Sequence, residues 1–252
     1  MSESRAKPLR LFIGVRVSMA TVSALNEAVQ AMRGAVGDRL RLRWIAPASY
    51  HITLAFLGWA RPEVTFALRD RVAGALAGQR AFELETMGLG GFPSPVRARV
   101  LWAGMDEAGS ARLTELAQRI AAAAEELGFA REERAFHAHV TLARLPVPGD
   151  IRSAIQGVSE QKFRHTWVDS AILFQSHMKS TGSEYEEKAR WNLEDDSKPS
   201  RRHRGPVETE SELESDAAFE EPSGDESGPE GAAELDGEPA EEEEQRDDGD
   251  QL

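Results

Sequence analysis

Hydrophobic and polar residues alternate over residues 9–17. Aliphatic side chains occupy every second position from Leu9 to Val17, and this period of two predicts a strand with one buried face. In residues 19–33, hydrophobic residues recur at spacings of three and four, which is typical of an amphipathic helix. The chain therefore begins with a strand that leads into a helix.

The same alternation of strand-like and helix-like segments continues to residue 193. We expect helices over residues 62–78, 113–128 and 150–156, the second of them ending at Gly128. We expect strands over residues 50–58, 81–87, 97–104, 137–145, 163–168, 171–175 and 185–193, with a turn-rich stretch at residues 88–95.

These segments form two similar β/α halves, which we expect to be joined near residues 90–96. Neither half shows the long buried βαβ series of a doubly wound sheet. We therefore predict a bilobal α+β fold with two pseudo-symmetric β/α halves, whose mainly antiparallel sheets face a central cleft. The order of the strands does not follow from the pattern.

Charge is distributed unevenly along the 252 residues. The formal net charge is −13, but residues 195–252 carry 22 acidic and 5 basic residues, which leaves residues 1–194 with a net charge of +4. Residues 195–252 contain only 10 hydrophobic residues, too few to offset an ordering cost of roughly 1–2 kcal/mol per residue. We expect a flexible N-terminus at residues 1–8, one domain over residues 9–194 and a disordered acidic tail at residues 195–252.

The composition also excludes several kinds of site. Without cysteine the chain has no disulfide, no thiolate nucleophile and no cysteine-ligated metal. No apolar run approaches the ~20 residues that span a bilayer, and no apolar segment directly follows the charged residues at the N-terminus. We expect a cytoplasmic monomer without membrane contact, and the partner of its tail is unknown.

One short string occurs twice, once in each half. The pattern His-aliphatic-Thr-Leu occupies residues 51–54 and again residues 139–142. Because side chains alternate along a strand, His51 and Thr53 share one face, while the aliphatic residues anchor the other face to a core. The same holds for His139 and Thr141. If the two halves face each other, two imidazoles and two hydroxyls converge on a site suited to a phosphate.

Two imidazoles suit the opening of a phosphodiester by in-line attack. A base takes a proton from the nucleophile, and an acid on the opposite side protonates the leaving oxygen. Near neutral pH one imidazole can be neutral and the other charged, because the unperturbed pKa of histidine is about 6.5. The hydroxyls of Thr53 and Thr141 can donate hydrogen bonds to the non-bridging phosphate oxygens. This chemistry requires neither a metal nor a cofactor.

A single His-x-Thr string in a strand is common by chance, and its histidine is more often structural than catalytic. Here both copies extend to His-aliphatic-Thr-Leu-Ala and occupy corresponding places in the two halves. The repeat therefore favours a functional site over a structural one.

With these motifs the sequence resembles the two-histidine (2H) phosphoesterase superfamily, and within it the RNA 2′,3′-cyclic phosphodiesterases, also called 2′-5′ RNA ligases. The resemblance covers residues 10–193 and is carried by residues 10–13, 51–58, 91–95, 100–104, 136–144 and 176–185. Family members commonly have proline before the second histidine, where this chain has Ala138. That difference removes no chemical group.

The resemblance implies a metal-independent reaction, the hydrolysis of an RNA 2′,3′-cyclic phosphate end to a 2′-phosphomonoester. It implies that His51 donates a proton to the leaving 3′ oxygen and that His139 is the base that activates water. From the sequence alone, the near-symmetry of the motifs leaves these two roles interchangeable. In reverse, the same groups would join a cyclic phosphate end to a 5′-hydroxyl.

Further residues are candidates for substrate binding. His137 would share a face with His139 on an unbroken strand. Arg144 could pair with a phosphate oxygen, although alternation places it opposite His139 unless the strand bends. Phe92 could stack on an RNA base, as could Trp102, and core packing is the alternative for both.

Two other functions are compatible with the sequence. The same two-histidine chemistry would act on a small cyclic nucleotide or a 2′-5′ oligonucleotide, because loops that are not readable here choose the substrate. A non-catalytic module that binds RNA or nucleotide phosphate belongs to a different class, but such a module needs no second titratable imidazole. The physiological RNA and the use of ligation in the cell also stay open.

Overall fold

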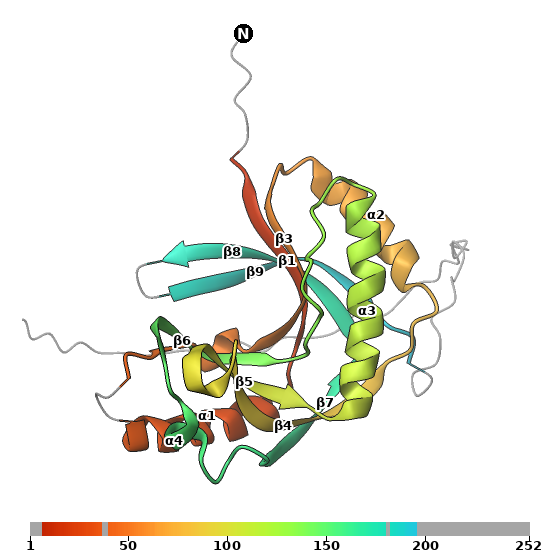
Figure 1. The fold of residues 1–252 in the computed structure, drawn as a ribbon. Helices are drawn as coiled ribbons and strands as arrows, with labels where there is room; N and C mark the ends of the chain where they lie inside the picture. Colours follow the sequence, from red (N-terminus) through yellow and green to blue (C-terminus); the bar gives the residue numbers. More distant parts are fainter. Residues whose placement is uncertain (1–6, 37–39, 180–181, 196–252) are drawn as a thin grey trace, which may run out of the picture. The chain divides into compact units, whose positions relative to one another are not determined.

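The computed structural model describes residues 7–36, 40–179 and 182–195 (Figure 1). These residues belong to one compact unit, Met1–Arg202. Of the predicted acidic tail only Asp195 is among them, and most of the predicted flexible N-terminus also lies outside them. Within the described ranges no helix has the length and apolar character needed to cross a membrane.

The described residues form nine strands, four α-helices and two short 3-10 helices. The strands are β1 (Leu9–Arg16), β2 (Arg43–Trp44), β3 (His51–Ala60), β4 (Phe82–Phe92), β5 (Ala98–Met105), β6 (Val140–Gly149), β7 (Lys162–Val168), β8 (Ser170–Lys179) and β9 (Gly182–Asn192). The helices are α1 (Met19–Val36), η2 (Pro47–Ser49), α2 (Val64–Leu76), η3 (Pro95–Arg97), α3 (Glu107–Glu125) and α4 (Arg152–Ile155).

The nine strands form one sheet whose neighbouring strands run antiparallel. Their order is β7-β4-β5-β6-β3-β1-β8-β9, and β2 pairs with β6. β3 and β6 meet at one residue pair, Ile52 and Val140. This narrow junction divides the sheet into one half with β7, β4, β5, β6 and β2 and another with β3, β1, β8 and β9. The predicted bilobal α+β fold with mainly antiparallel pairing is confirmed.

One lobe combines strands from distant parts of the chain, whereas the other is built mainly from consecutive strands. β8 and β9 pair beside β1, so both ends of the described chain build the lobe that contains β3. The other lobe contains β4, β5, β6 and β7. The stretch near residues 90–96, where a junction between the halves is predicted, connects β4 to β5 within this second lobe. The two lobes are therefore not successive halves of the chain.

The helices pack on the sheet through the apolar stripes that the sequence predicts. α2 and α3 lie side by side, and α3 contacts β3 and β4 (Figure 1). Leu113, Leu116 and Ile120 of α3 are 0% exposed. α3 begins earlier than predicted and ends at Glu125, three residues before Gly128, whose φ of +83° is a conformation that glycine adopts without steric cost. The buried side chains of β3 and β6 belong to this core, which supports the face of the sheet opposite the histidines.

The strand bounds differ from the predicted ones, β2 was not predicted, and two of the differences affect the site. β4 continues to Phe92 through the stretch predicted to be turn-rich, because Gly88, at φ +73°, forms a bulge that keeps the strand paired with β5. β6 begins at Val140, so His137 and His139 precede the strand instead of lying within it. Strand alternation therefore does not fix where the His137 side chain points.

Candidate active site

The junction of β3 and β6 brings the two His-x-Thr motifs together. Ile52 and Val140 pair across this junction and are both 0% exposed. In an antiparallel pair, the residues that flank such a buried pair point to the opposite face of the sheet. The two motifs therefore lie side by side with their histidines and threonines away from the core, and His139 is close enough for its charge to act on His51.

Both imidazoles are oriented by a carbonyl two residues earlier in the chain. Nδ1 of His51 lies 2.7 Å from the carbonyl oxygen of Ser49, and Nδ1 of His139 lies 2.7 Å from that of His137. Because a carbonyl only accepts, each Nδ1 donates, and each neutral ring keeps Nε2 unprotonated. Nε2 of His51 lies 3.0 Å from the hydroxyl oxygen of Thr53, which can donate to it. Each ring thus presents Nε2 for proton transfer.

An aromatic cluster surrounds His51. Phe12 lies 4.9 Å from the imidazole between ring centroids, and Tyr185 approaches it edge-on at 5.0 Å. Phe174 stacks on Phe12 at 5.1 Å. With Ile172 these rings form a small hydrophobic cluster apart from the main core. The sequence analysis did not identify this cluster, although Phe12 gave a signal as a bulky aromatic on the polar face of its strand.

A second aromatic pair lies beside His139. Phe92, one of the predicted substrate-binding residues, contacts the His139 ring edge-on at 5.0 Å. Trp102 lies 5.1 Å from Phe92 and 4.9 Å from the exposed ring of His137, measured between centroids. His137 itself lies 6.3 Å from His139. The predicted candidates Phe92 and His137 are therefore both placed next to the second imidazole.

A β-bulge turns Arg144 toward the histidines. Against β5 the register of β6 slips between Thr141 and Ala143, so Leu142 is an extra residue. Leu142 and Ala143 are both 0% exposed, and alternation resumes with Arg144 on the face of Thr141. The positive charge of Arg144 acts on both imidazoles of the motifs. The strand bend needed to bring Arg144 to the face of the histidines is therefore present.

The first motif carries the same bulge but a different side chain after it. Against β1 the register of β3 slips between Thr53 and Ala55, and Phe56 then occupies the place that Arg144 has in β6. Phe56 is 62% exposed, and its ring lies 6.5 Å from that of Phe12. Phe56 was not among the predicted site residues. It follows His51 by five residues, just as Arg144 follows His139, and this equal spacing could have identified it.

The pKa values of both site histidines are lowered. Burial is the largest cause for His51 and for His139, because a desolvated imidazolium is unfavourable. The carbonyl hydrogen bonds oppose this shift, whereas Arg144 adds to it at both rings. Each ring also has an imidazole neighbour that lowers its pKa, which is His139 for His51 and His137 for His139. Both rings are therefore neutral at pH 7 without a bound anion.

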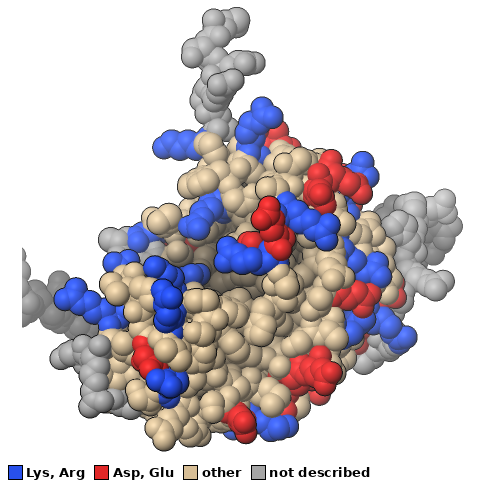
Figure 2. Space-filling model, in the orientation of Figure 1, with Lys and Arg blue, Asp and Glu red and all other residues tan. Residues whose placement is uncertain are grey.

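The face of the sheet beside the histidines is hollowed. A cavity of about 40 Å³ next to His51 is lined by Arg16, Ser49, Tyr50, Phe174 and Tyr185. Burial raises the pKa of Tyr50 to about 12, so its phenol stays protonated at neutral pH. Figure 2 shows a hollow in the drawn face, with Lys and Arg side chains on several sides of it. This surface suits an anionic ligand.

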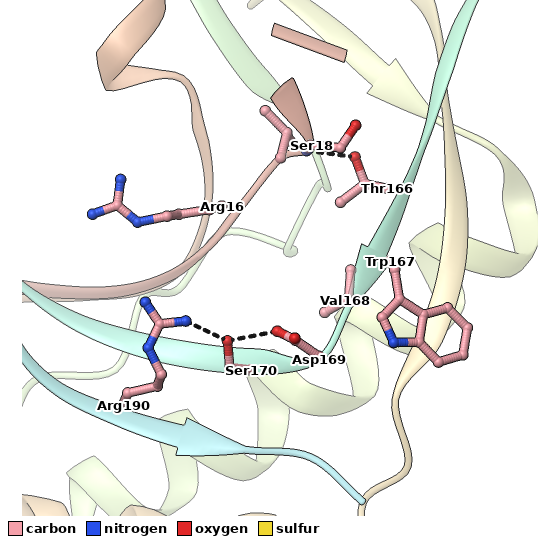
Figure 3. A pocket seen from close by; sticks show the side chains of 9 residues that line it. Arg16, Ser18, Thr166, Trp167, Val168, Asp169, Ser170 and Arg190 are labelled. Carbon is pink, nitrogen blue, oxygen red and sulfur yellow. Dashed lines mark hydrogen bonds between the residues drawn. The ribbon is translucent and has the colours of Figure 1, made fainter. Parts of the chain in front are cut away.

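Arg16 also lines a second, larger cleft. This cleft has a volume of about 170 Å³ and includes Ser18, Thr166 and Arg190 (Figure 3). Arg16 pairs with His51 across β1 and β3, so its positive charge lies near the first imidazole and lowers the pKa of that ring. The sequence analysis did not single out Arg16.

The other histidines of the described domain are engaged elsewhere. Nε2 of His177 lies 3.0 Å from a carboxylate oxygen of Glu186. The ring of His165 lies 3.7 Å from the carboxylates of Glu83 and Glu85. Across the described ranges, no group of three or more His, Asp or Glu side chains is arranged to hold a metal ion.

Seven known proteins with similar sequences carry the same name. A relative from Archaeoglobus fulgidus, named RNA 2′,3′-cyclic phosphodiesterase, is 28% identical over 180 residues, which is 71% of this chain and 97% of that protein. One from Geobacillus stearothermophilus with the same name is 33% identical over 129 residues, 51% of this chain and 40% of that protein. The chain thus spans nearly all of the first relative and less than half of the second.

Solved structures show the same fold. A crystal structure of a Thermus thermophilus protein has a TM-score of 0.62 at 25% identity and covers 75% of this chain and all of that one. E. coli LigT complexed with 3′-AMP has a TM-score of 0.59 at 25% identity, with 74% of this chain and 99% of that chain covered. Residues 21–178 match the 2′-5′ RNA ligase superfamily. This match includes both His-x-Thr motifs, and the chain belongs to that superfamily of two-histidine phosphoesterases.

Proposed function

We propose that the chain is an RNA 2′,3′-cyclic phosphodiesterase that hydrolyses the cyclic end to a 2′-phosphomonoester. The observation that carries the proposal is the pairing of Ile52 with Val140, which joins the two His-x-Thr motifs at one junction, where the charge of His139 acts on His51. The enzyme class is that of the curated relatives. The RNA substrate is taken from their names and from the chemistry below.

The reaction consumes one water and breaks one P–O bond. The oxygen of water attacks phosphorus opposite the 3′ oxygen, and a base takes the proton that this water loses. The P–O3′ bond breaks, an acid protonates O3′, and the phosphate stays on the 2′ oxygen. Two imidazoles on opposite sides of phosphorus complete this cycle because one gains the proton equivalent that the other loses.

His139 is proposed as the base and His51 as the acid. Burial is the largest cause that favours a neutral His139, the form that accepts a proton, and the imidazole of His137 and the guanidinium of Arg144 add to it. Burial and Arg144 act in the same direction on His51, so the division of roles follows the resemblance to the family. An anionic phosphate bound at the site raises the pKa of a neighbouring imidazole, and this allows His51 to carry a proton in the complex.

The threonines and Arg144 are proposed to hold the phosphate between the rings. Hydroxyl groups of Thr53 and Thr141 can donate to the two non-bridging oxygens, where negative charge develops in the transition state. The guanidinium of Arg144 can bind one of these oxygens with two N–H groups. In the reverse direction the same groups would join a cyclic end to a 5′-hydroxyl, although water favours hydrolysis.

Phe56 is proposed to stack on the base of the terminal nucleotide. It is an exposed ring on the face of the histidines, and aromatic stacking accepts any of the four bases. Phe92 is the corresponding candidate on the side of His139. The substrate has a phosphate on one side and a base on the other. The residues after the two bulges match this difference, because Arg144 is suited to the phosphate and Phe56 to the base.

The test uses an RNA that ends in a 2′,3′-cyclic phosphate, with EDTA present, and identifies the product. We expect a 2′-phosphate, with turnover reduced roughly 10²–10⁴-fold in His51→Ala and in His139→Ala. His177→Ala, a histidine held by Glu186 elsewhere on the sheet, is the matched control and should retain full turnover. Activity that survives in both site variants, or that EDTA abolishes, contradicts the proposal.

A further inference from the structure

β3 continues beyond the site with two exposed aromatic residues. Phe56 is 62% exposed and Trp59 is 69% exposed, whereas Leu57 and Ala60 of the same strand are buried. Open positions of an antiparallel sheet with one buried face are usually polar. Large exposed aromatic rings that adjoin a functional site mark a surface for a ligand or partner. Because the Trp59 side chain is mostly exposed, it contributes little to the stability of the fold.

Trp59 lies on the same face as the histidines and faces an arginine. It pairs with Arg10 of β1, and alternation along β1 puts Arg10 on the side of Phe12, opposite the buried Leu11. The charge of Arg10 also acts on Tyr185, whose ring lies 5.0 Å from the imidazole of His51. A basic group therefore lies beside the exposed indole, on the face that also carries the aromatic cluster around His51.

Aromatic rings form a continuous line along β1 and β3 from the first imidazole outward. Centroid distances are 4.9 Å from His51 to Phe12 and 6.5 Å from Phe12 to Phe56. Trp59 follows Phe56 after a second bulge, and their partners Arg10 and Phe12 are two residues apart on β1, about 7 Å along a strand. This spacing suits bases that are splayed apart and stacked on protein rings, which is how single-stranded RNA is bound.

The cleft on the other side of His51 is a weaker path for RNA. Its two arginines already face a carboxylate: Arg190 donates to Glu187 at 2.7 and 2.9 Å, and Arg16 lies 3.9 Å from the same group. Trp167 borders this cleft, but Figure 3 shows its indole pointing away from the two guanidinium groups. A phosphate there would compete with Glu187, and a base would find no ring facing it.

We propose that the RNA preceding the cyclic phosphate runs along β1 and β3, with Trp59 stacking on the base of the penultimate nucleotide and Arg10 binding its phosphodiester. This inference rests on the proposed function, because it places the catalytic phosphate between the histidines and the terminal base on Phe56. It makes the enzyme selective for oligonucleotide ends over free cyclic mononucleotides.

The test compares kcat/KM for adenosine 2′,3′-cyclic phosphate with kcat/KM for the dinucleotide adenylyl-adenosine 2′,3′-cyclic phosphate, using the full chain. We expect the dinucleotide to be preferred roughly 5- to 150-fold, the effect of one base–aromatic stack. Trp59→Ala should lose this preference while hydrolysing the mononucleotide as before, and Trp59→Tyr should keep most of it. Arg10→Gln should reduce the slope of log(kcat/KM) against log[salt] for the dinucleotide by about 0.7.

Trp167→Ala is the matched control, since Trp167 is also an exposed tryptophan, at 49%, but borders the other cleft. It should keep the dinucleotide preference. A preference that survives in Trp59→Ala, that is lost in Trp167→Ala instead, or that is absent from the unaltered chain overturns the inference and leaves the proposed function intact. If the unaltered chain hydrolyses neither compound, the proposed function fails and the inference fails with it.

Discussion

Ile52 of β3 and Val140 of β6 are 88 residues apart in the sequence and pair directly at the centre of the sheet. Both side chains are completely buried, so a one-residue slip of either strand would turn its aliphatic residues outward and its histidine inward. The core therefore fixes the register, and the register fixes the catalytic geometry. The two motifs lie side by side because of this one pair.

Replacing either threonine by valine should lower turnover and leave the fold intact. Thr53→Val and Thr141→Val keep the β-branched shape that the strand requires but remove the hydroxyl donor to the phosphate. Loss of one such donor costs about 10²–10³-fold in kcat. Thr53→Ser and Thr141→Ser keep the hydroxyl and should retain most of the activity. Equal kcat values for the serine and valine variants would contradict a role for the hydroxyls.

Gly14→Ala should reduce both activity and stability. A Cβ atom at Gly14 would lie 2.6 Å from the carbonyl oxygen of Ile52 and 3.5 Å from the imidazole of His51. The contact at 2.6 Å involves backbone, so β3 has to move away from β1, and the pairing with Val140 moves with it. Gly74→Ala is the control, since its Cβ meets nothing within 4 Å and lies in a helix.

We expect Gly74→Ala to stabilise the chain by about 0.5–1 kcal/mol and to leave kcat unchanged. Urea denaturation and kcat measured on both variants check this pair of outcomes. Wild-type kcat in Gly14→Ala would show that the close approach of β1 to β3 does not position the imidazole.

The pH profile of kcat/KM should be bell-shaped and centred on the acid side of pH 6.5. Burial and positive neighbours lower the pKa of both His51 and His139, and kcat/KM reports the free enzyme. The acid loses its proton as the pH rises through the lowered pKa values. The midpoint of the alkaline limb therefore lies at a pH below about 6.5, the ordinary pKa of histidine. The two limbs belong to the coupled pair and not to single residues. Limbs symmetrical about pH 8 would contradict this environment.

Folding stability should decrease as the pH falls below about 6.5. The folded-state pKa of His51 and of His139 is lower than the unfolded value, so the unfolded chain binds more protons in this range. Stability is complete above the unfolded pKa and is lost as the pH falls toward the folded values. His51→Gln combined with His139→Gln should flatten this dependence between about pH 5 and 7. Urea unfolding of both proteins measures it, and parallel curves would rule out the two rings as its source.

The repeated motif and the period-two strands were sufficient to predict the lobed antiparallel fold. His51 and His139 were identified because each lies in a string that places an imidazole and a hydroxyl on one face. Which strands share a lobe was not predictable, because β8 and β9 return to β1 through pairings that local patterns do not encode. Long-range pairing depends on the whole core and not on any one segment.

Strand bulges and long-range pairing, which simple alternation does not predict, decide which further residues reach the site. Arg144 reaches the site face only because Leu142 forms a bulge, and a bulge has no reliable signature in the residues themselves. Phe56 follows the same bulge in β3, and a phenylalanine in a strand is normally assigned to the core. Tyr185 reaches His51 from the far end of the described chain. Arg144 was a candidate from the sequence, but its place on the site face, like those of Phe56 and Tyr185, depends on how the strands pair.

Phe12→Leu should raise the pKa of His51 and move the alkaline limb of kcat/KM to higher pH. The Phe12 ring covers the imidazole at 4.9 Å, and burial is the main cause of the lowered pKa, so a smaller side chain admits water and favours the charged form. Phe163→Leu is the control, because Phe163 is 4% exposed and Phe12 is 5% exposed, but Phe163 lies on β7. Both substitutions should cost about 1 kcal/mol of stability, measured by urea denaturation. Only Phe12→Leu should shift the limb, and a shift in both variants or in neither would show that the aromatic cluster does not set the titration of His51.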